Sequence, residues 1–162
     1  MKLSSAGLEL IKKSEGFRAR VYPDVAGIPS IGYGHRLLPH EAFPNGLTEA
    51  EASGILTADI REAEQAILRL VKVPLTQGQF DALIDFCFNL GEGRLAASTL
   101  LKALNARRYQ AACEQLLRWD LSGGEVHQGL RLRREAEARL WNQSETQIPI
   151  PSQPFEAVGA QL

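Results

Sequence analysis

The sequence has little cysteine and little histidine, and neither is clustered. Its 162 residues include two cysteines, Cys87 and Cys113, and three scattered histidines. Both cysteines lie within apolar stretches, which favours a pair of reduced thiols in the core, with a disulfide between them as the alternative. No CxxC pair or His-rich cluster is present, so we expect no bound metal and no other cofactor.

Long hydrophobic runs are lacking as well. No stretch approaches the roughly 20 apolar residues that cross a bilayer as a helix. The N-terminus carries Lys2, but Ser4, Ser5, Gly7 and Glu9 interrupt any apolar signal region. We therefore expect a soluble protein made in the cytosol, which would need another component to reach a target outside the membrane.

The chain also lacks a large excess of charge of either sign. It holds 18 Lys and Arg and 19 Asp and Glu, for a formal net charge of −1. The distribution is uneven, because residues 94–141 contain nine basic and five acidic side chains. Such a basic lobe could attract an acidic polymer, and the alternative is an ordinary solvated helix face.

The first part of the chain predicts one helix followed by a small sheet. Residues 3–15 place apolar side chains on one helical face, with Ser4 or Ser5 as the cap and Gly16 as the stop. Residues 17–35 mix β-forming side chains with glycine and proline, which is typical of short strands and tight turns.

Capping-box patterns mark the starts of two further helices. Thr48 and Glu51 precede a long amphipathic helix that ends by Pro74, and its length suggests a connector between two lobes. Thr76 and Gln79 precede a segment that is apolar on most sides. We expect this segment to form a buried central helix, stopped by two glycines at its end.

Shorter helices are expected around residues 100–106, 109–119 and 129–141. The predicted fold class is therefore α+β and mostly helical, with a small β subdomain and a helical lobe joined by a long helix. A ligand cleft should lie between the two lobes. We expect residues 1–143 to form one domain and residues 144–162, which contain three prolines, to form a tail outside it.

The candidate chemistry lies in the segment that follows the first helix. Glu15 sits at the carboxyl end of that helix, where the helix dipole and apolar neighbours disfavour an ionised carboxylate, as a general acid requires. Asp24 lies in the first turn of the sheet and Ser30 in the returning strand. Two carboxyls that face a gap are the minimum for glycoside hydrolysis, although unrelated surface charges at this spacing are common.

The pattern as a whole is more specific than these two carboxyls. It closely resembles the signature of phage-type lysozymes, or endolysins, which form glycoside hydrolase family 24. The resemblance is carried by Glu15-Gly16, Tyr22-x-Asp24, Gly27 and the run Ser30-Ile31-Gly32-Tyr33-Gly34-His35, and then by residues 79–91, Ser98-Thr99, residues 109–112, Trp119, Gly129-Leu130 and residues 133–135. It covers about 140 residues and leaves out only the tail.

The resemblance implies a lysozyme-like fold and hydrolysis of the β-1,4 bond between N-acetylmuramic acid and N-acetylglucosamine in peptidoglycan, with inversion at the anomeric carbon. It maps Glu15 to the general acid, Asp24 to the second carboxylate and Ser30 to the third catalytic position. The family usually has threonine where Ser30 stands. We expect the Ser30 hydroxyl to accept a hydrogen bond from the attacking water and to donate one to Asp24.

Three further residues match family positions. His35 is expected to pair with an acid and tie the β subdomain to its neighbour. Phe88 is expected to line the cleft and bind substrate, with core packing as the alternative. Trp119 could stack on a sugar ring or lie partly buried in the core. No metal site is expected.

Two other functions stay open from the sequence. A lytic transglycosylase would need one acid and no water nucleophile, and a non-catalytic cell-wall-binding protein would have lost the acid. The expected partners are peptidoglycan glycan strands and a holin-type membrane pore for release, with no nucleic acid, and the protein should be a monomer. We expect it to stay in the host cytoplasm until the membrane is permeabilised, then lyse the host cell.

Overall fold

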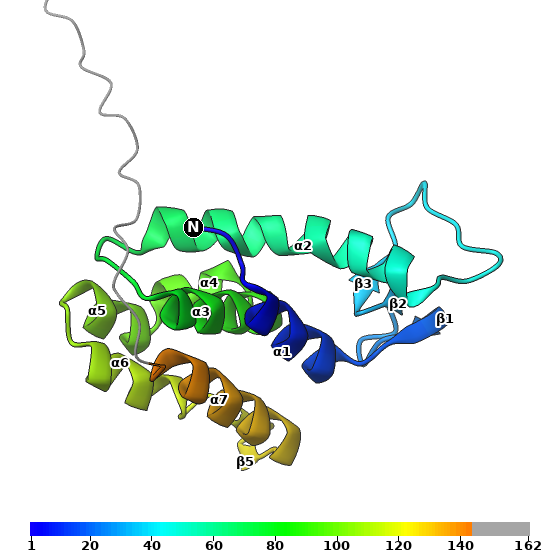
Figure 1. The fold of residues 1–162 in the computed structure, drawn as a ribbon. Helices are drawn as coiled ribbons and strands as arrows, with labels where there is room; N and C mark the ends of the chain where they lie inside the picture. The colour runs from blue at the N-terminus through cyan, green and yellow to red at the C-terminus, as the bar shows by residue number, and fades with distance from the viewer. Residues whose placement is uncertain (144–162) are drawn as a thin grey trace, which may run out of the picture.

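A computed structural model describes residues 1–143 of the chain. A first helix leads into a three-stranded sheet, and six further helices follow, with a short hairpin before the last one (Figure 1). The elements are α1 Ser5–Glu15, β1 Arg18–Pro23, β2 Pro29–Gly32, β3 His35–Arg36, α2 Glu49–Leu70, α3 Gln77–Leu90, α4 Glu92–Ala97, α5 Thr99–Asn105, α6 Tyr109–Leu116, β4 Leu121–Ser122, β5 Glu125–Val126 and α7 Gln128–Trp141. The predicted α+β class is confirmed.

Both ends of α1 are fixed by specific hydrogen bonds. The Ser4 hydroxyl accepts from the backbone N–H of Gly7, and the backbone N–H of Ser4 donates to Asp81 of α3 over 3.0 Å. At the other end, the N–H of Gly16 donates to the carbonyl of Lys12. The predicted cap and stop are therefore correct, and they place Glu15 at the point where the chain leaves the helix for the sheet.

The sheet is antiparallel throughout, with strand order β1-β2-β3. Tyr22 pairs with Ser30 across the first two strands, and Ile31 pairs with His35 across the next two. Ile31 and Ser30 of the central strand are almost fully buried. The sheet therefore holds Ser30 rigidly against the rest of the molecule.

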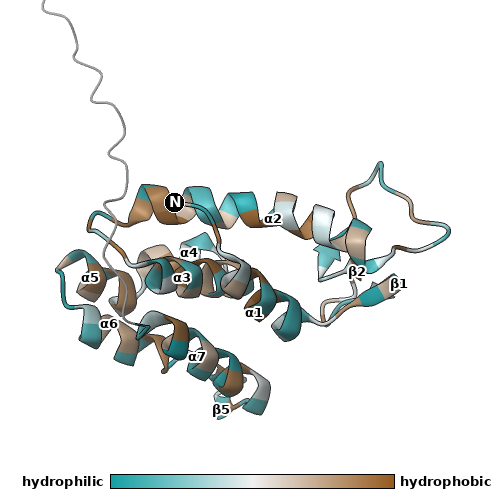
Figure 2. Ribbon diagram, viewed as in Figure 1, coloured by the Kyte–Doolittle hydropathy of each residue, from teal (hydrophilic) through white to brown (hydrophobic). Residues whose placement is uncertain are grey.

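Helix α2 connects the sheet to the helical lobe, as its length predicts. Its capping box forms between Thr48 and Glu51. Figure 1 shows α2 running from the sheet along the helical lobe. Its buried residues, including Leu56, Ile60 and Ile67, belong to the hydrophobic core. Figure 2 shows that the helices also carry hydrophilic residues.

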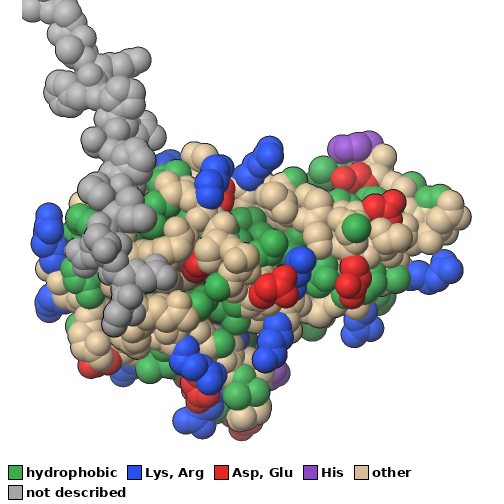
Figure 3. All heavy atoms as spheres, in the orientation of Figure 1, with side chains coloured by type: hydrophobic (Ala, Val, Ile, Leu, Met, Phe, Trp, Pro, Cys, Tyr) green, Lys and Arg blue, Asp and Glu red, His purple; other side chains and the backbone are tan. Residues whose placement is uncertain are grey.

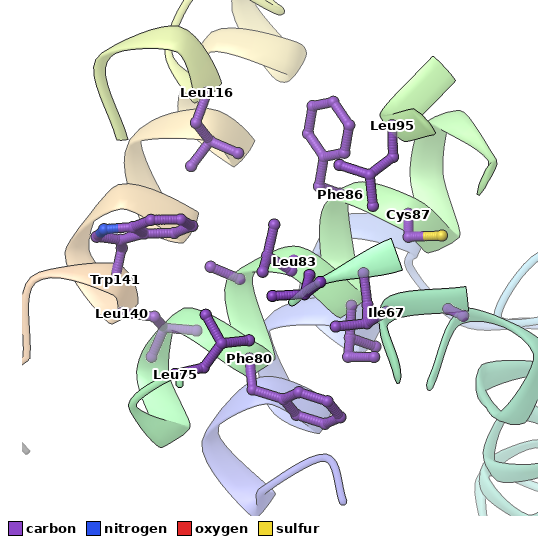
Figure 4. Packing of buried hydrophobic residues seen from close by; sticks show 14 of the residues in the cluster. Ile67, Leu75, Phe80, Leu83, Phe86, Cys87, Leu95, Leu116, Leu140 and Trp141 are labelled. Atoms are coloured by element: carbon purple, nitrogen blue, oxygen red, sulfur yellow. The ribbon is translucent and has the colours of Figure 1, made fainter. Parts of the chain in front are cut away.

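Helix α3 is the centre of the helical lobe. Every residue from Gly78 to Cys87 is buried, and α3 contacts α1, α2, α4 and α7. Figure 4 shows its side chains Phe80, Leu83 and Phe86 among those of neighbouring helices. At Gly78, a Cβ atom would lie 2.0 Å from the carbonyl oxygen of Leu140, so the glycine allows α3 and α7 to approach closely.

Two local predictions need correction. Gly91 ends α3 as predicted, but Gly93, which the sequence also predicts as a stop, lies inside α4. The two-residue strands β4 and β5, which flank a turn at Gly123 and Gly124, are also not predicted from the sequence. Such short elements are set by tertiary contacts more than by local sequence.

Cys87 and Cys113 are both buried and free, in agreement with the prediction of reduced core thiols. Within residues 1–143, no helix is both long and apolar enough to span a membrane. The predicted tail, residues 144–162, lies outside the described residues.

Candidate active site

A cleft with a volume of about 850 Å³ lies between the sheet and the helical lobe. The carboxyl end of α1, the sheet, α2 and the corner between α3 and α4 supply its lining. Glu15, Asp24 and Ser30 all line it, so three residues from different elements meet at one place. This is the kind of inter-lobe cleft that the sequence predicts.

Glu15 is the last residue of α1, and its side chain is 23% exposed. Its Oε1 atom accepts a 2.7 Å hydrogen bond from Nη1 of Arg133 in α7. The sequence predicts a helix end and apolar neighbours around Glu15, and the structure adds a guanidinium as the direct partner of the carboxyl. Sequence spacing cannot show this contact, which joins the two ends of the domain.

Arg133 is held in place by a second carboxylate. Its Nε and Nη2 atoms donate to the two oxygens of Asp85 in α3, each over 2.8 Å. This two-point pairing fixes the plane of the guanidinium, so that Nη1 is left to reach Glu15. Asp85 is fully buried. A charged residue inside the otherwise apolar stretch of α3 was the one sequence signal that could have revealed this pair.

Asp24 forms a tight turn with its own backbone. Its Oδ1 atom accepts from the N–H groups of Ala26 and Ile28 over 2.8 and 2.9 Å, and Oδ2 accepts from the exposed side chain of Arg36. The hydrogen bond from Ile28 is the main cause that lowers the pKa of Asp24, and Arg36 lowers it further. Asp24 is therefore an anion at neutral pH.

Ser30 lies in β2 with only 1% of its surface exposed. Its hydroxyl donates to the carbonyl oxygen of Ile28 over 3.3 Å. The expected hydrogen bond from Ser30 to Asp24 is thus not formed in this structure, and both residues instead form hydrogen bonds with the backbone of Ile28. The lone pairs of the Ser30 hydroxyl are left to accept a hydrogen bond in the cleft.

His35 lies between two carboxylates. Nδ1 is 2.9 Å from Asp59 of α2, and Nε2 is 2.8 Å from Glu41 in the loop after the sheet. Burial acts to lower the pKa of His35, but the hydrogen bonds to Glu41 and Asp59 outweigh it and raise the pKa. The contact ties β3 to α2, which is the kind of acid pairing expected of this residue.

Phe88 and Trp119 differ in their position relative to the cleft. Phe88 lines the cleft. Trp119 is half-buried, packs edge-on against Phe86 with ring centroids 5.3 Å apart, and is not among the residues that line the cleft within residues 1–143. The core interpretation of Trp119 therefore fits its position, since its ring packs against Phe86 and the hydrophobic core.

One thiol also reaches the cleft. Cys87 lines it beside Phe88, and burial raises the pKa of the thiol to about 11. It stays protonated near neutral pH and is a poor nucleophile. Among residues 1–143, no group of three or more His, Cys, Asp and Glu side chains is arranged to hold a metal ion.

The basic residues of the helical lobe do not form one patch on the face shown in Figure 3. That figure shows Lys and Arg side chains spread over the helical lobe and over the sheet. Two of the nine basic residues in the span 94–141, Arg133 and Arg134, are buried in ion pairs. The surface is therefore less basic than the count predicts.

A cleft that brings together one carboxyl at a helix end and a second carboxylate with a lowered pKa contains the pair of groups that glycoside hydrolases use. Residues 12–137 match the sequence model of the phage lysozyme family. The chain therefore belongs to the phage lysozyme family, the muramidase-type hydrolases that lyse bacterial cell walls.

Known relatives agree with this assignment. The endolysin of Salmonella phage P22 is 39% identical over 141 residues, which cover 85% of this chain and 97% of that protein. The endolysin of Bacillus phage B103 is 42% identical over 144 residues, which cover 87% of this chain and 54% of that protein. The chain thus spans about half the length of the Bacillus phage relative and nearly all of the Salmonella phage one.

Solved structures share the fold. A crystal structure of a P22 lysozyme variant superposes with a TM-score of 0.79 at 38% identity, over 87% of this chain and 98% of that chain. The muramidase domain of SpmX from Asticaccaulis excentricus gives a TM-score of 0.81 at 35% identity, over 88% and 99%. Both cover the helical lobe and the sheet together.

Proposed function

We propose that this enzyme hydrolyses the β-1,4 bond between N-acetylmuramic acid and N-acetylglucosamine in peptidoglycan, with Glu15 as the general acid. The observation that carries the proposal is that Glu15, Asp24 and Ser30 line one cleft. Glycoside hydrolysis needs a proton donor for the leaving oxygen and a second group for the sugar or the attacking water. The cleft supplies both.

The environments of the two carboxyls support these roles. Asp24 is kept ionised by two backbone N–H groups and Arg36, so it cannot donate the proton. Glu15 is then the donor. Once Glu15 has released its proton, the charge that forms on it lies 2.7 Å from the permanently charged guanidinium of Arg133.

The attacking water would be held by Ser30 and Asp24. The Ser30 hydroxyl donates to Ile28, so its lone pairs can accept a hydrogen bond from the water. Asp24 accepts two hydrogen bonds on Oδ1, and two of the three guanidinium nitrogens of Arg36, Nε and Nη2, contact Oδ2. Because Arg36 is 62% exposed, its side chain can move aside and free Oδ2 for the water. Attack from this side would invert the anomeric carbon.

Two other residues complete the proposal. Phe88 offers an aromatic face in the cleft, and such faces suit the apolar side of a pyranose ring. His35 would hold the sheet at a fixed distance from α2 through Asp59. Trp119 has no assigned contact with substrate in this proposal.

Glu15→Gln is the experiment that tests the assignment. The change is nearly isosteric and removes the proton, so lysis of permeabilised Gram-negative cells should fall by about 10²–10⁴-fold. Glu9→Gln is a matched control, since Glu9 lies on the same helix and does not line the cleft. Near-native lysis by the Glu15 variant would overturn the proposal and favour a different acid.

Product analysis separates the hydrolase from its alternatives. Mass spectrometry of digested peptidoglycan should show reducing ends and not the 1,6-anhydro ends that a lytic transglycosylase leaves. A non-catalytic wall-binding protein would sediment with peptidoglycan and release no fragments at all.

We further propose that the enzyme reaches the wall of its host through a holin-type pore. Expression of the protein in the host cytoplasm should leave cells intact until a pore-forming protein is induced with it. Lysis by the enzyme expressed alone would show another route to the wall. The protein is still predicted to be a monomer in solution and to have no affinity for nucleic acid.

A further inference from the structure

A buried cluster of charged side chains lies behind Glu15, between α3 and α7. Arg134 and Glu137 are both fully buried. Nη2 of Arg134 donates to Oε1 of Glu137 over 2.5 Å and to Oδ1 of Asn89 over 3.0 Å. The guanidinium also lies over the ring of Phe86, 5.2 Å from its centroid. The mechanism described above does not use Glu137, so its complete burial needs an explanation.

The second carboxyl oxygen of Glu137, Oε2, suggests that explanation. Oε2 is buried, and no donor within residues 1–143 reaches it. Burial raises the pKa of Glu137 well above its ordinary value, and a hydrogen bond with Asp85 raises it further. Two carboxyls in contact need one proton between them. Asp85 already accepts two hydrogen bonds from Arg133, so Asp85 is the anion and Glu137 carries the proton.

The charges of the cluster agree with this proton. It contains two guanidiniums, Arg133 and Arg134, and three carboxyls, Glu15, Asp85 and Glu137. With Glu137 protonated, the cluster is neutral when Asp85 and Glu15 are both anions. That is the state reached when Glu15 has given its proton to the leaving oxygen. Arg134 then has neutral partners, Oε1 of Glu137, Oδ1 of Asn89 and the ring of Phe86. The net charge of the cluster is balanced only when Asp85 and Glu15 are both anions, and a buried cluster without excess charge is less costly, which favours the product state of the proton transfer.

We propose that Glu137 is a positioning residue for Glu15: its protonated carboxyl donates a hydrogen bond to Asp85, which orients Arg133 and thereby holds the Glu15 carboxyl at the cleft. Glu137 does not line the cleft, so it acts only through Asp85 and Arg133. The proposal rests on the proposed function of Glu15 as the proton donor. It connects the interior of the helical lobe to the reacting group.

Three variants test the proposal on soluble peptidoglycan fragments, each assayed well below its own melting temperature. Glu137→Gln keeps an oxygen that accepts from Arg134 and an amide that donates to Asp85, so kcat should stay close to native. Glu137→Ala removes both contacts, and kcat should fall by about tenfold or more because Glu15 is misplaced, with KM unchanged. Leu140→Ala is the matched control, since it empties core volume on the same helix and should lower stability without lowering kcat.

Two kinetic results would overturn the proposal. A folded Glu137→Ala variant with native kcat would show that the cluster is only structural. A Glu137→Gln variant as slow as Glu137→Ala would show that the ionised form of Glu137 is the one required.

A measurement on the native enzyme covers the case in which Glu137→Ala does not fold. The ¹³C chemical shift of the Glu137 carboxyl, assigned with the Glu137→Gln variant, should report a protonated group at neutral pH. An ionised Glu137 there overturns the proposal whatever the variants do. If Glu15→Gln is active, Glu15 is not the proton donor and the proposed function fails. If Glu15→Gln is inactive while Glu137→Ala keeps the native kcat, only the positioning role of Glu137 is excluded.

Discussion

Oε2 of Glu15 lies 3.2 Å from the position that a Cβ atom would occupy on Gly34. Gly34 has a φ of +83°, in the region where a side chain is strained. The other oxygen of Glu15 is held by Arg133. The carboxyl is thus confined between a guanidinium and a bare stretch of backbone, which leaves it little freedom to turn.

Gly34→Ala should therefore reduce activity as well as stability. The positive φ alone should cost about 1–2 kcal/mol of the free energy of unfolding, and the added methyl group should push the Glu15 carboxyl away from its present position. A displacement of this kind can lower the rate by as much as about 100-fold. Thermal unfolding and lysis rate, measured on the same preparation, separate the two effects.

Gly124→Ala is the control for that strain. Gly124 has a φ of +87°, and no atom lies within 4 Å of its potential Cβ. It belongs to the turn between β4 and β5 and does not line the cleft. It should lose similar stability and keep its activity. Equal activity losses in the two variants would mean that the Gly34 contact with Glu15 has no catalytic consequence.

Asp24→Asn should remove activity while keeping the fold. The amide oxygen can still accept from the N–H groups of Ala26 and Ile28, as Oδ1 of Asp24 does now, so the turn should persist. The negative charge is lost, and a drop in kcat of about 10²-fold or more is expected from loss of an electrostatic contact in a transition state. Asp120→Asn, outside the cleft, serves as the control, and retained activity in the Asp24 variant would leave the second carboxylate unassigned.

Ser30→Ala tests whether the hydroxyl holds the water. We expect a loss of about tenfold or more, or about 1.4 kcal/mol in the barrier, because nothing else in the proposal accepts that hydrogen bond. Ser30→Thr should match or exceed the native rate if the buried site accommodates its methyl group, since the threonine rotamer is more restricted. Initial rates on purified peptidoglycan, with circular dichroism for folding, measure both.

The control for Ser30→Ala is Ser53→Ala. The Ser53 hydroxyl also donates to a backbone carbonyl, that of Glu49, but on the exposed face of α2. Loss of such a hydrogen bond alone should not affect the rate. If Ser30→Ala is as fast as Ser53→Ala, Asp24 positions the water by itself.

The His35 contacts predict a specific pH dependence of stability. The pKa of His35 is raised in the folded protein, so its stabilising contribution is complete below the unfolded pKa of about 6.5 and is lost as the pH rises through the folded value. Burial raises the pKa of Asp59, whereas hydrogen bonds from the backbone of Leu38 and from His35 lower that of Glu41.

Denaturant unfolding at a series of pH values measures this dependence. The difference in unfolding free energy between the native enzyme and His35→Gln should shrink as the pH rises above about 6.5. The difference isolates His35 from the other two histidines. A difference that is independent of pH across this range would contradict a charged His35 between Asp59 and Glu41.

The sequence predicts the fold well wherever the cause is local. Both capping boxes depend on residues three positions apart, and the Ser4 cap and the Gly16 stop depend on immediate neighbours. These hydrogen bonds can be predicted because the donor and the acceptor lie within a few positions of each other in the sequence. Helix α4 was missed for the opposite reason, since glycine at 93 weakens the local preference and packing decides the outcome.

The site is predictable only in part. The sequence places Glu15 at a helix end, but its partner Arg133 is 118 positions away, and Asp85 is 48 positions from Arg133. No periodicity connects residues at such separations. Trp119 shows the same limit, because an aromatic side chain that covers a core and one that covers a cleft look alike in sequence.

The separation of Glu15 and Arg133 also bears on the order of events during synthesis. Glu15 is translated 118 positions before Arg133, which lies in α7, the last helix of the described residues. A nascent chain that has not yet reached α7 therefore lacks the guanidinium that contacts this carboxyl. The contact that holds Glu15 forms only after α7 has been translated and has packed against α1 and α3.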